Sequence, residues 1–105
     1  MKYAITSGRL KGISMPNVFT AFGCRFYFFS NEGMPREPLH IHVSKDHGAC
    51  KAKFWIDENG VPSLDSSEGF SSKELKGMTA IITASFDEIK EAWKKHFEEE
   101  PTYKQ

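Results

Sequence analysis

The sequence of 105 residues contains few cysteines, carries no net charge and has no long hydrophobic run. Two cysteines, Cys24 and Cys50, are too few for a disulfide scaffold, and no Cys-x-x-Cys pair suggests a zinc ribbon. No apolar stretch reaches the roughly 18 residues of a membrane-spanning helix, and the N-terminus lacks the hydrophobic core of a signal peptide. We therefore expect a cytoplasmic protein with no membrane partner and with two buried, reduced thiols.

The net charge of zero hides an uneven distribution. Residues 1–53 contain eight Lys or Arg against three Asp or Glu, whereas residues 54–105 contain six against eleven. A basic half of this kind is compatible with a polyanionic or acidic partner, and the polarity is equally compatible with head-to-tail self-association. The acidic half also fits a solvated helix surface.

The length and composition indicate one compact domain. A hydrophobic fraction of 39% and nine Phe residues are enough for a single core. The first 14 residues are polar and weakly patterned, so we expect an N-terminal extension over 1–14, a single α+β domain over 15–100 and a C-terminal tail over 101–105.

Several segments rich in β-branched and aromatic residues are bounded by turn residues, as strands are. The predicted strands are Val18–Ser30, Glu37–Ser44, Ala49–Asp57 and a short Val61–Leu64. Gly23 marks a bulge or a close approach within the first of them. Turns are predicted over 31–35, at 46–48 and, because of an Asn-Gly pair, at 58–60.

After residue 69 the hydrophobic period changes to that of a helix. Ser71 and Glu74 form a capping-box pattern, and apolar residues then recur at spacings of three and four as far as Phe97. A second capping-box pattern at Ser85 and Glu88 favours two helices that meet near Ala84. The predicted fold class is α+β, a three- or four-stranded antiparallel meander covered on one face by one or two C-terminal helices.

Alternation along the strands separates a core face from a polar face. The predicted core residues are Val18, Phe22, Cys24, Phe26, Phe28, Leu39, Ile41, Val43, Cys50, Ala52, Phe54 and Ile56. The opposite parity collects Phe19, Arg25, Tyr27, Phe29, His40, His42, Lys51, Lys53 and Trp55. This second set is cationic, aromatic and imidazole-bearing, and it defines the candidate site.

Several functions fit this polar face. Arg25, Tyr27, Lys51, Lys53 and Trp55 combine cations with rings, as do sheets that bind single-stranded nucleic acid. The same residues also fit a protein-protein or homodimer interface.

The two histidines of this face, His40 and His42, suggest further uses. As a catalytic pair they could give and take a proton on a phosphodiester. They could instead bind a divalent metal such as zinc, with His47, Asp46 or Glu37 as a third ligand. No cofactor is firmly predicted.

From Met15-Pro16 onward, the aromatic strand, the run Pro38-Leu39-His40-Ile41-His42-Val43 and the helical segment ending at Trp93 carry a family resemblance. Over residues 15–97 the chain resembles the bacterial domain-of-unknown-function family numbered 4160. The motif of that family has two prolines and then His-Phe-His, whereas this chain keeps one proline and has Ile41 in the place of Phe.

The resemblance implies a small bacterial α+β protein, commonly encoded beside a second small protein in a toxin–antitoxin-like arrangement, and it brings no established reaction. The leading hypothesis is a component of such a pair, with the second protein as its partner, whose polar face binds RNA, a nucleotide or another phosphate-containing ligand. A non-catalytic interaction or homodimerisation module is the alternative, and metal binding through His40 and His42 is the third. Enzymatic activity is left open.

Overall fold

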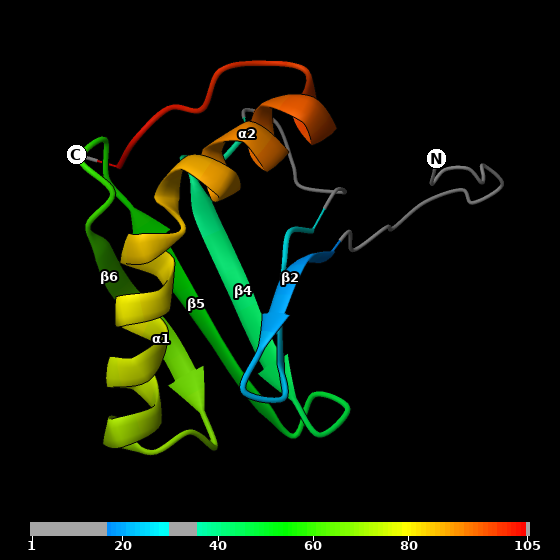
Figure 1. Cartoon of the computed structure of the whole chain (residues 1–105), viewed down its shortest axis with the longest axis vertical. Helices are drawn as coiled ribbons and strands as arrows, with labels where there is room; N and C mark the ends of the chain where they lie inside the picture. The colour runs from blue at the N-terminus through cyan, green and yellow to red at the C-terminus, as the bar shows by residue number, and fades with distance from the viewer. Residues whose placement is uncertain (1–16, 30–35, 105) are drawn as a thin grey trace, which may run out of the picture.

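The chain forms one five-stranded antiparallel sheet followed by two helices in a computed structural model that describes residues 17–29 and 36–104 (Figure 1). The strands are β2 (Asn17–Ala21), β3 (Cys24–Tyr27), β4 (His40–Lys45), β5 (Cys50–Ile56) and β6 (Pro62–Glu68). Each pairs with the next, in the order β2-β3-β4-β5-β6. The α+β meander is confirmed, with more strands than predicted. The extension over 1–14, Met15-Pro16 and the turn over 31–35 lie outside the described residues.

The first predicted strand is a hairpin. Ala21 pairs with Cys24, and the two residues between them, Phe22 and Gly23, both have positive φ, at 54° and 74°. Two positive φ values are the requirement of a type I′ turn, which Gly meets easily and Phe rarely does. Because Phe is unusual there, the sequence signal at Gly23 indicated only a bulge.

Because the chain reverses at this turn, side chains do not alternate continuously between the two sheet faces from β2 into β3. Two residues were therefore assigned to the wrong face from the sequence. Phe22, predicted in the core, is 83% exposed at the tip of the hairpin. Phe19, predicted on the polar face, stacks on the core residue Phe26 with ring centroids 4.7 Å apart. The other predicted face assignments in β3, β4 and β5 agree with the strand register.

The β5–β6 hairpin is longer than predicted. The turn at Asn59-Gly60 is confirmed, with the Asp57 carboxylate accepting from the backbone N–H groups of Asn59 and Val61. Gly60 has a φ of 83°, and a Cβ there would lie 2.8 Å from the ring of Phe86. Strand β6 runs from Pro62 to Glu68, four residues beyond the predicted end at Leu64.

Two helices follow, as predicted: α1 (Ser72–Ala84) and α2 (Phe86–Phe97). The Ser71 side chain accepts from the backbone N–H of Glu74 while the Glu74 carboxylate accepts from that of Ser71, so the predicted capping box is present. Ser85, by contrast, makes no side-chain capping bond at the start of α2. That second box is therefore wrong, although it marked the boundary correctly.

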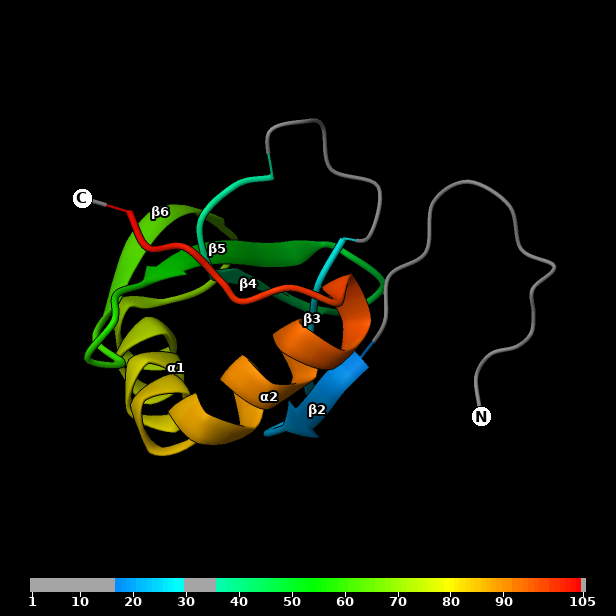
Figure 2. The same ribbon diagram turned by 90° about the horizontal axis from the view of Figure 1, so that it is seen from above.

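The helices lie on one side of the sheet, and the hydrophobic core lies between them and the strands (Figure 2). Its fully buried members include Phe26, Ile41 and Phe54 from the sheet and Ile82 and Trp93 from the helices. Both cysteines are free; Cys24 is buried as predicted, but Cys50 is only half-buried. Within the described ranges no helix is long and apolar enough to cross a membrane.

The residues that follow α2 pack against the start of β4. The Thr102 carbonyl accepts from the backbone N–H of Leu39 at 2.8 Å, and Pro101 is buried. Figure 2 shows this segment crossing the end of the sheet near α2. One end of the sheet is therefore closed by chain that is far away in the sequence.

Candidate functional site

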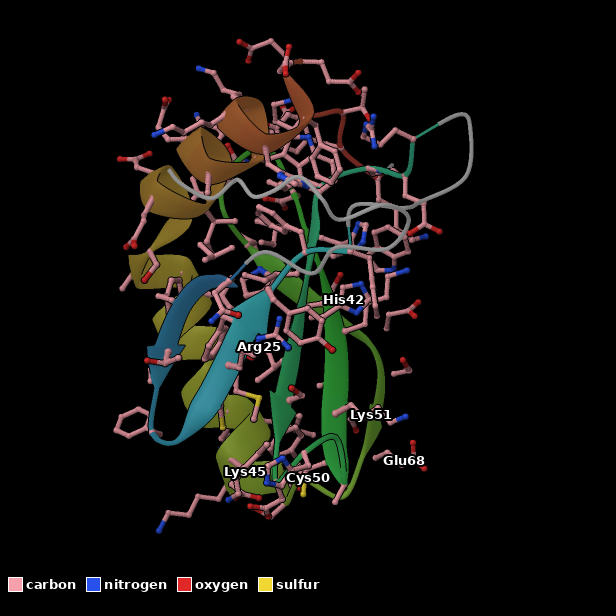
Figure 3. All side chains as sticks on the ribbon, turned by 90° about the vertical axis from the view of Figure 1, so that its right-hand side faces the viewer. Arg25, His42, Lys45, Cys50, Lys51 and Glu68 are labelled. Carbon is pink, nitrogen blue, oxygen red and sulfur yellow. The ribbon has the colours of Figure 1, made fainter. Side chains whose placement is uncertain are left out.

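Most of the predicted polar residues lie on the sheet face opposite the helices. The exceptions are Phe19, which packs on the core residue Phe26, and His40, whose ring reaches Trp93 of α2. In the strand register His42 lies between Tyr27 and Lys53, and His40 is opposite Trp55. Ser44, two residues further along β4, is paired with both Arg25 and Lys51. Figure 3 shows His42, Lys51 and Glu68 on this side. The strand register thus brings together seven of the nine residues of the predicted polar face, which are Arg25, Tyr27, His40, His42, Lys51, Lys53 and Trp55.

His40 is buried, with only 1% of its surface exposed. Its Nδ1 lies 2.8 Å from the Pro38 carbonyl, which can only accept, so Nδ1 carries the proton and donates. The ring packs edge-on against Trp55 and Trp93 at centroid distances of 5.5 and 5.6 Å. The expectation that both imidazoles lie on an open surface is therefore wrong for His40, because α2 and the residues after it cover this end of the face.

His42 is half-buried between aromatic rings. It stacks on Tyr27 at 5.5 Å and meets Phe29 edge-on at 4.5 Å. Its Nε2 atom is covered and has no hydrogen-bond partner among the described residues. Burial, with help from the nearby His40 and Lys53, lowers the pKa of His42 to about 4, so the ring is neutral at physiological pH.

The two imidazoles do not meet at an accessible point. Their centroids are 5.1 Å apart, but His40 is almost inaccessible and the Nε2 of His42 is covered. A phosphodiester would reach both rings only if the residues covering them moved. The lysine and arginine side chains of the predicted site are Arg25, Lys51 and Lys53.

Two of these cations lie over aromatic rings. The guanidinium of Arg25 is 4.4 Å from the centroid of the Tyr27 ring, and the ammonium of Lys53 is 4.3 Å from that of Trp55. A cation over a ring face is attracted by its quadrupole, which fixes the position of an otherwise flexible side chain. Arg25 also donates to the Asn17 side chain. The rings thus act as supports for cations, and Tyr27 itself is only 7% exposed.

Acidic side chains partly neutralise this charge. The Glu37 carboxylate accepts from Lys53 at 2.9 Å, and this hydrogen bond holds the pKa of Glu37 below its usual range. Lys51 is exposed, lies opposite Glu68 in the register, and forms no ion pair with any residue that the structure describes. Lys51 is therefore the cation most available to an incoming anion.

Two adjoining hollows run along this face, with volumes of about 380 and 530 Å³, and they share Tyr27 and Lys51. We call them together the open-face groove. Its lining includes Arg25, Tyr27, His42, Ser44, Lys51, Lys53 and Ser66. Trp55 lies beside the groove, where its Nε1 donates to Asp65 at 3.0 Å.

The wall formed by β6 was missed by sequence reasoning. Ser66 is paired with Lys53, and Glu68 with Lys51, so both belong to the polar face. Leu64 is followed by four polar residues, 65–68, so the sequence shows no alternation of apolar and polar side chains there. Without an apolar face, a strand and a loop look alike in sequence.

A metal site finds little support in the geometry. Across residues 17–29 and 36–104 there is no group of three His, Cys, Asp or Glu side chains placed to hold a metal ion. Of the third ligands considered for the His40 and His42 pair, Asp46 and His47 lie in the turn at the far end of β4. The Glu37 carboxylate lies 3.7 Å from the His40 Nε2 but accepts a hydrogen bond from Lys53 at 2.9 Å.

Comparison with known proteins gives one match. The family model described as "Domain of unknown function (DUF4160)" matches residues 23–94, which run from the turn before β3 into α2 and make up more than half of the chain. Neither the curated proteins nor the solved structures yield a match. The matched region contains β3 to β6, the His-x-His run and most of both helices, and the chain therefore belongs to the DUF4160 family.

Proposed function

We propose that the open-face groove binds a phosphate-bearing nucleotide ligand, and that single-stranded RNA is its natural form. The observation that carries this proposal is the set of cations, Arg25, Lys51 and Lys53, bordering one groove on one sheet face, two of them held over aromatic rings. Cations whose positions are already fixed lose less conformational entropy when they bind a phosphate.

The spacing of the cations suits a ligand with more than one phosphate. Lys51 and Lys53 are two residues apart on β5, which separates their Cα atoms by about 7 Å, and Arg25 lies across β4 from Lys51. The groove is open along its length, so a chain of nucleotides can follow it.

The groove also has groups that recognise a nucleoside. The planar guanidinium of Arg25 can stack on a base, and the hydroxyls of Ser44 and Ser66 can bond to a ribose. These groups favour a nucleotide ligand over inorganic phosphate.

Glu37 limits the affinity, because it competes with phosphate for Lys53. With about three phosphate contacts, the plot of log K against log salt concentration should have a slope of about −2 for a single strand. A strongly basic nucleic-acid protein would show a much steeper dependence.

The test is fluorescence anisotropy with a labelled single-stranded RNA of about ten nucleotides, at several salt concentrations. We expect Lys51→Ala with Lys53→Ala to weaken binding by at least tenfold, or about 1.4 kcal/mol. Lys76→Ala on α1, another exposed lysine, is the matched control and should bind like the wild type. Inorganic phosphate and a mononucleotide as competitors distinguish phosphate binding from nucleotide binding. Absent or salt-independent RNA binding would refute the proposal.

A further inference from the structure

The tip of the β2–β3 hairpin carries an exposed aromatic side chain in a strained backbone position. Phe22 is 83% exposed, the highest value among the large hydrophobic residues that the structure describes as exposed. Its φ of 54° is in the left-handed region, which bulky residues rarely adopt. Asn in that position would give Asn-Gly, the preferred pair for such a turn. The folding of the hairpin does not explain why Phe is there.

A small apolar hollow lies directly beside Phe22, between the hairpin and α1. Its volume is about 240 Å³, and Phe22 forms one wall. Phe26, Met78 and Ile81 also line it, and Gly77 on α1 leaves it open, since a Cβ there would meet nothing within 4 Å. The surface therefore has an aromatic projection and an apolar recess side by side.

We propose that Phe22 and this hollow form a self-complementary surface through which two copies of the chain associate about a two-fold axis, with Phe22 of each copy in the hollow of the other. A two-fold interface joins the same patch on both subunits. A projection beside a recess therefore gives two equivalent contacts, because the projection of each subunit enters the recess of the other. A different partner would need its own recess for Phe22 and its own apolar projection for the hollow. A second copy has them by symmetry.

The charges around the hollow fit the same arrangement. Lys73 and Glu74 both line it, and Glu74 is held by an ion pair with Lys45 at 3.2 Å. A rim with both signs of charge can face a second copy of itself without net repulsion. The hollow is on the helix side of the sheet and the open-face groove is on the other side, but Gly23 and Lys45, which line the groove, adjoin Phe22 and Glu74 of the hollow. Association is therefore measured without RNA, so that its failure is distinguishable from a failure of the proposed RNA binding.

The first test is Phe22→Asn, measured by sedimentation equilibrium from micromolar to about 0.5 mM. We expect wild-type protein to reach twice the monomer mass and the variant to remain monomeric, with a dissociation constant raised at least about tenfold. Because Asn suits the turn better than Phe, the variant should fold at least as well as the wild type. Loss of association therefore cannot be attributed to unfolding, and circular dichroism verifies this.

The second test fills the recess instead of removing the projection. Gly77→Leu places a side chain in open space and raises helix propensity, so it should abolish association and preserve the fold. Leu64→Asn, which alters another exposed apolar residue, should still associate. A wild type that is monomeric throughout would overturn the proposal and leave the surface to a different partner. A Phe22→Asn or Gly77→Leu variant that still dimerises would overturn it in favour of another interface.

Discussion

The two ends of the polar sheet face differ in what covers them, although the same strands and the same residue parity build both. At the end near α2, His40 packs against Trp55 and Trp93 and is 1% exposed. At the other end, Lys51 is exposed beside two hollows. Alternation along a strand decides on which face of the sheet a side chain lies. Segments that are distant in the sequence decide whether that part of the face is exposed to solvent or buried.

The largest expected effect is at the covered end. His40→Ala removes a fully buried ring and leaves the Pro38 carbonyl without its donor, so we expect the free energy of unfolding to fall by about 3 kcal/mol. His42→Ala should cost about 1 kcal/mol, because that ring is half-buried and its Nε2 has no partner among the described residues. Urea denaturation of both variants measures the difference. Equal decreases in the free energy of unfolding for the two variants would contradict the difference in burial between His40 and His42.

The next effect is a pH dependence that comes from His42, at the boundary between the two ends. Its pKa is about 4 in the folded chain, mainly because burial disfavours the charged ring, against an ordinary value of 6.5. Between these values the unfolded chain binds more protons, so the free energy of unfolding should fall as the pH is lowered through this range and stay constant above it. With allowance for partial exposure, we expect a loss of roughly 1–2 kcal/mol.

Two variants isolate this contribution. His42→Phe keeps an aromatic ring between Tyr27 and Phe29 and should remove much of the pH dependence. The pKa of His96 is also lowered, by burial and by Arg36, so His96→Gln is measured in parallel. If the free energy of unfolding of His42→Phe depends on pH as strongly as that of the wild type, the protonation of His42 is not the source of the pH dependence.

The smallest effects are expected at the open end. Lys53→Ala breaks the ion pair with Glu37 and the contact with Trp55, and should cost about 0.5 kcal/mol. Lys51→Ala should change the free energy of unfolding by less than about 0.3 kcal/mol, since its side chain is exposed. Thermal denaturation of the two single variants measures this. A large loss for Lys51→Ala would mean that the open end is also structural.

Much of the fold follows from local patterns. Strong alternation in β4 and β5, the Asn59-Gly60 turn and the Ser71 capping box were predicted correctly because each depends on near neighbours in the chain. The β2–β3 turn was missed because Phe22 is an improbable residue at positive φ. Strand β6 was cut short because its polar sequence carries no periodic signal.

The sequence by itself determined the α+β class, the boundary between the two helices and the common face of Arg25, Tyr27, His40, His42, Lys51, Lys53 and Trp55, since helix and strand periods fix which side chains share a side. Only the tertiary structure decided which of these residues are accessible. The accessibility of each residue depends on the position of α2, on the backbone hydrogen bond between Leu39 and Thr102, and on the chain reversal at Phe22. The periodicity of a single strand or helix does not determine these features, because the first two join residues far apart in the sequence and the third changes the direction of the chain.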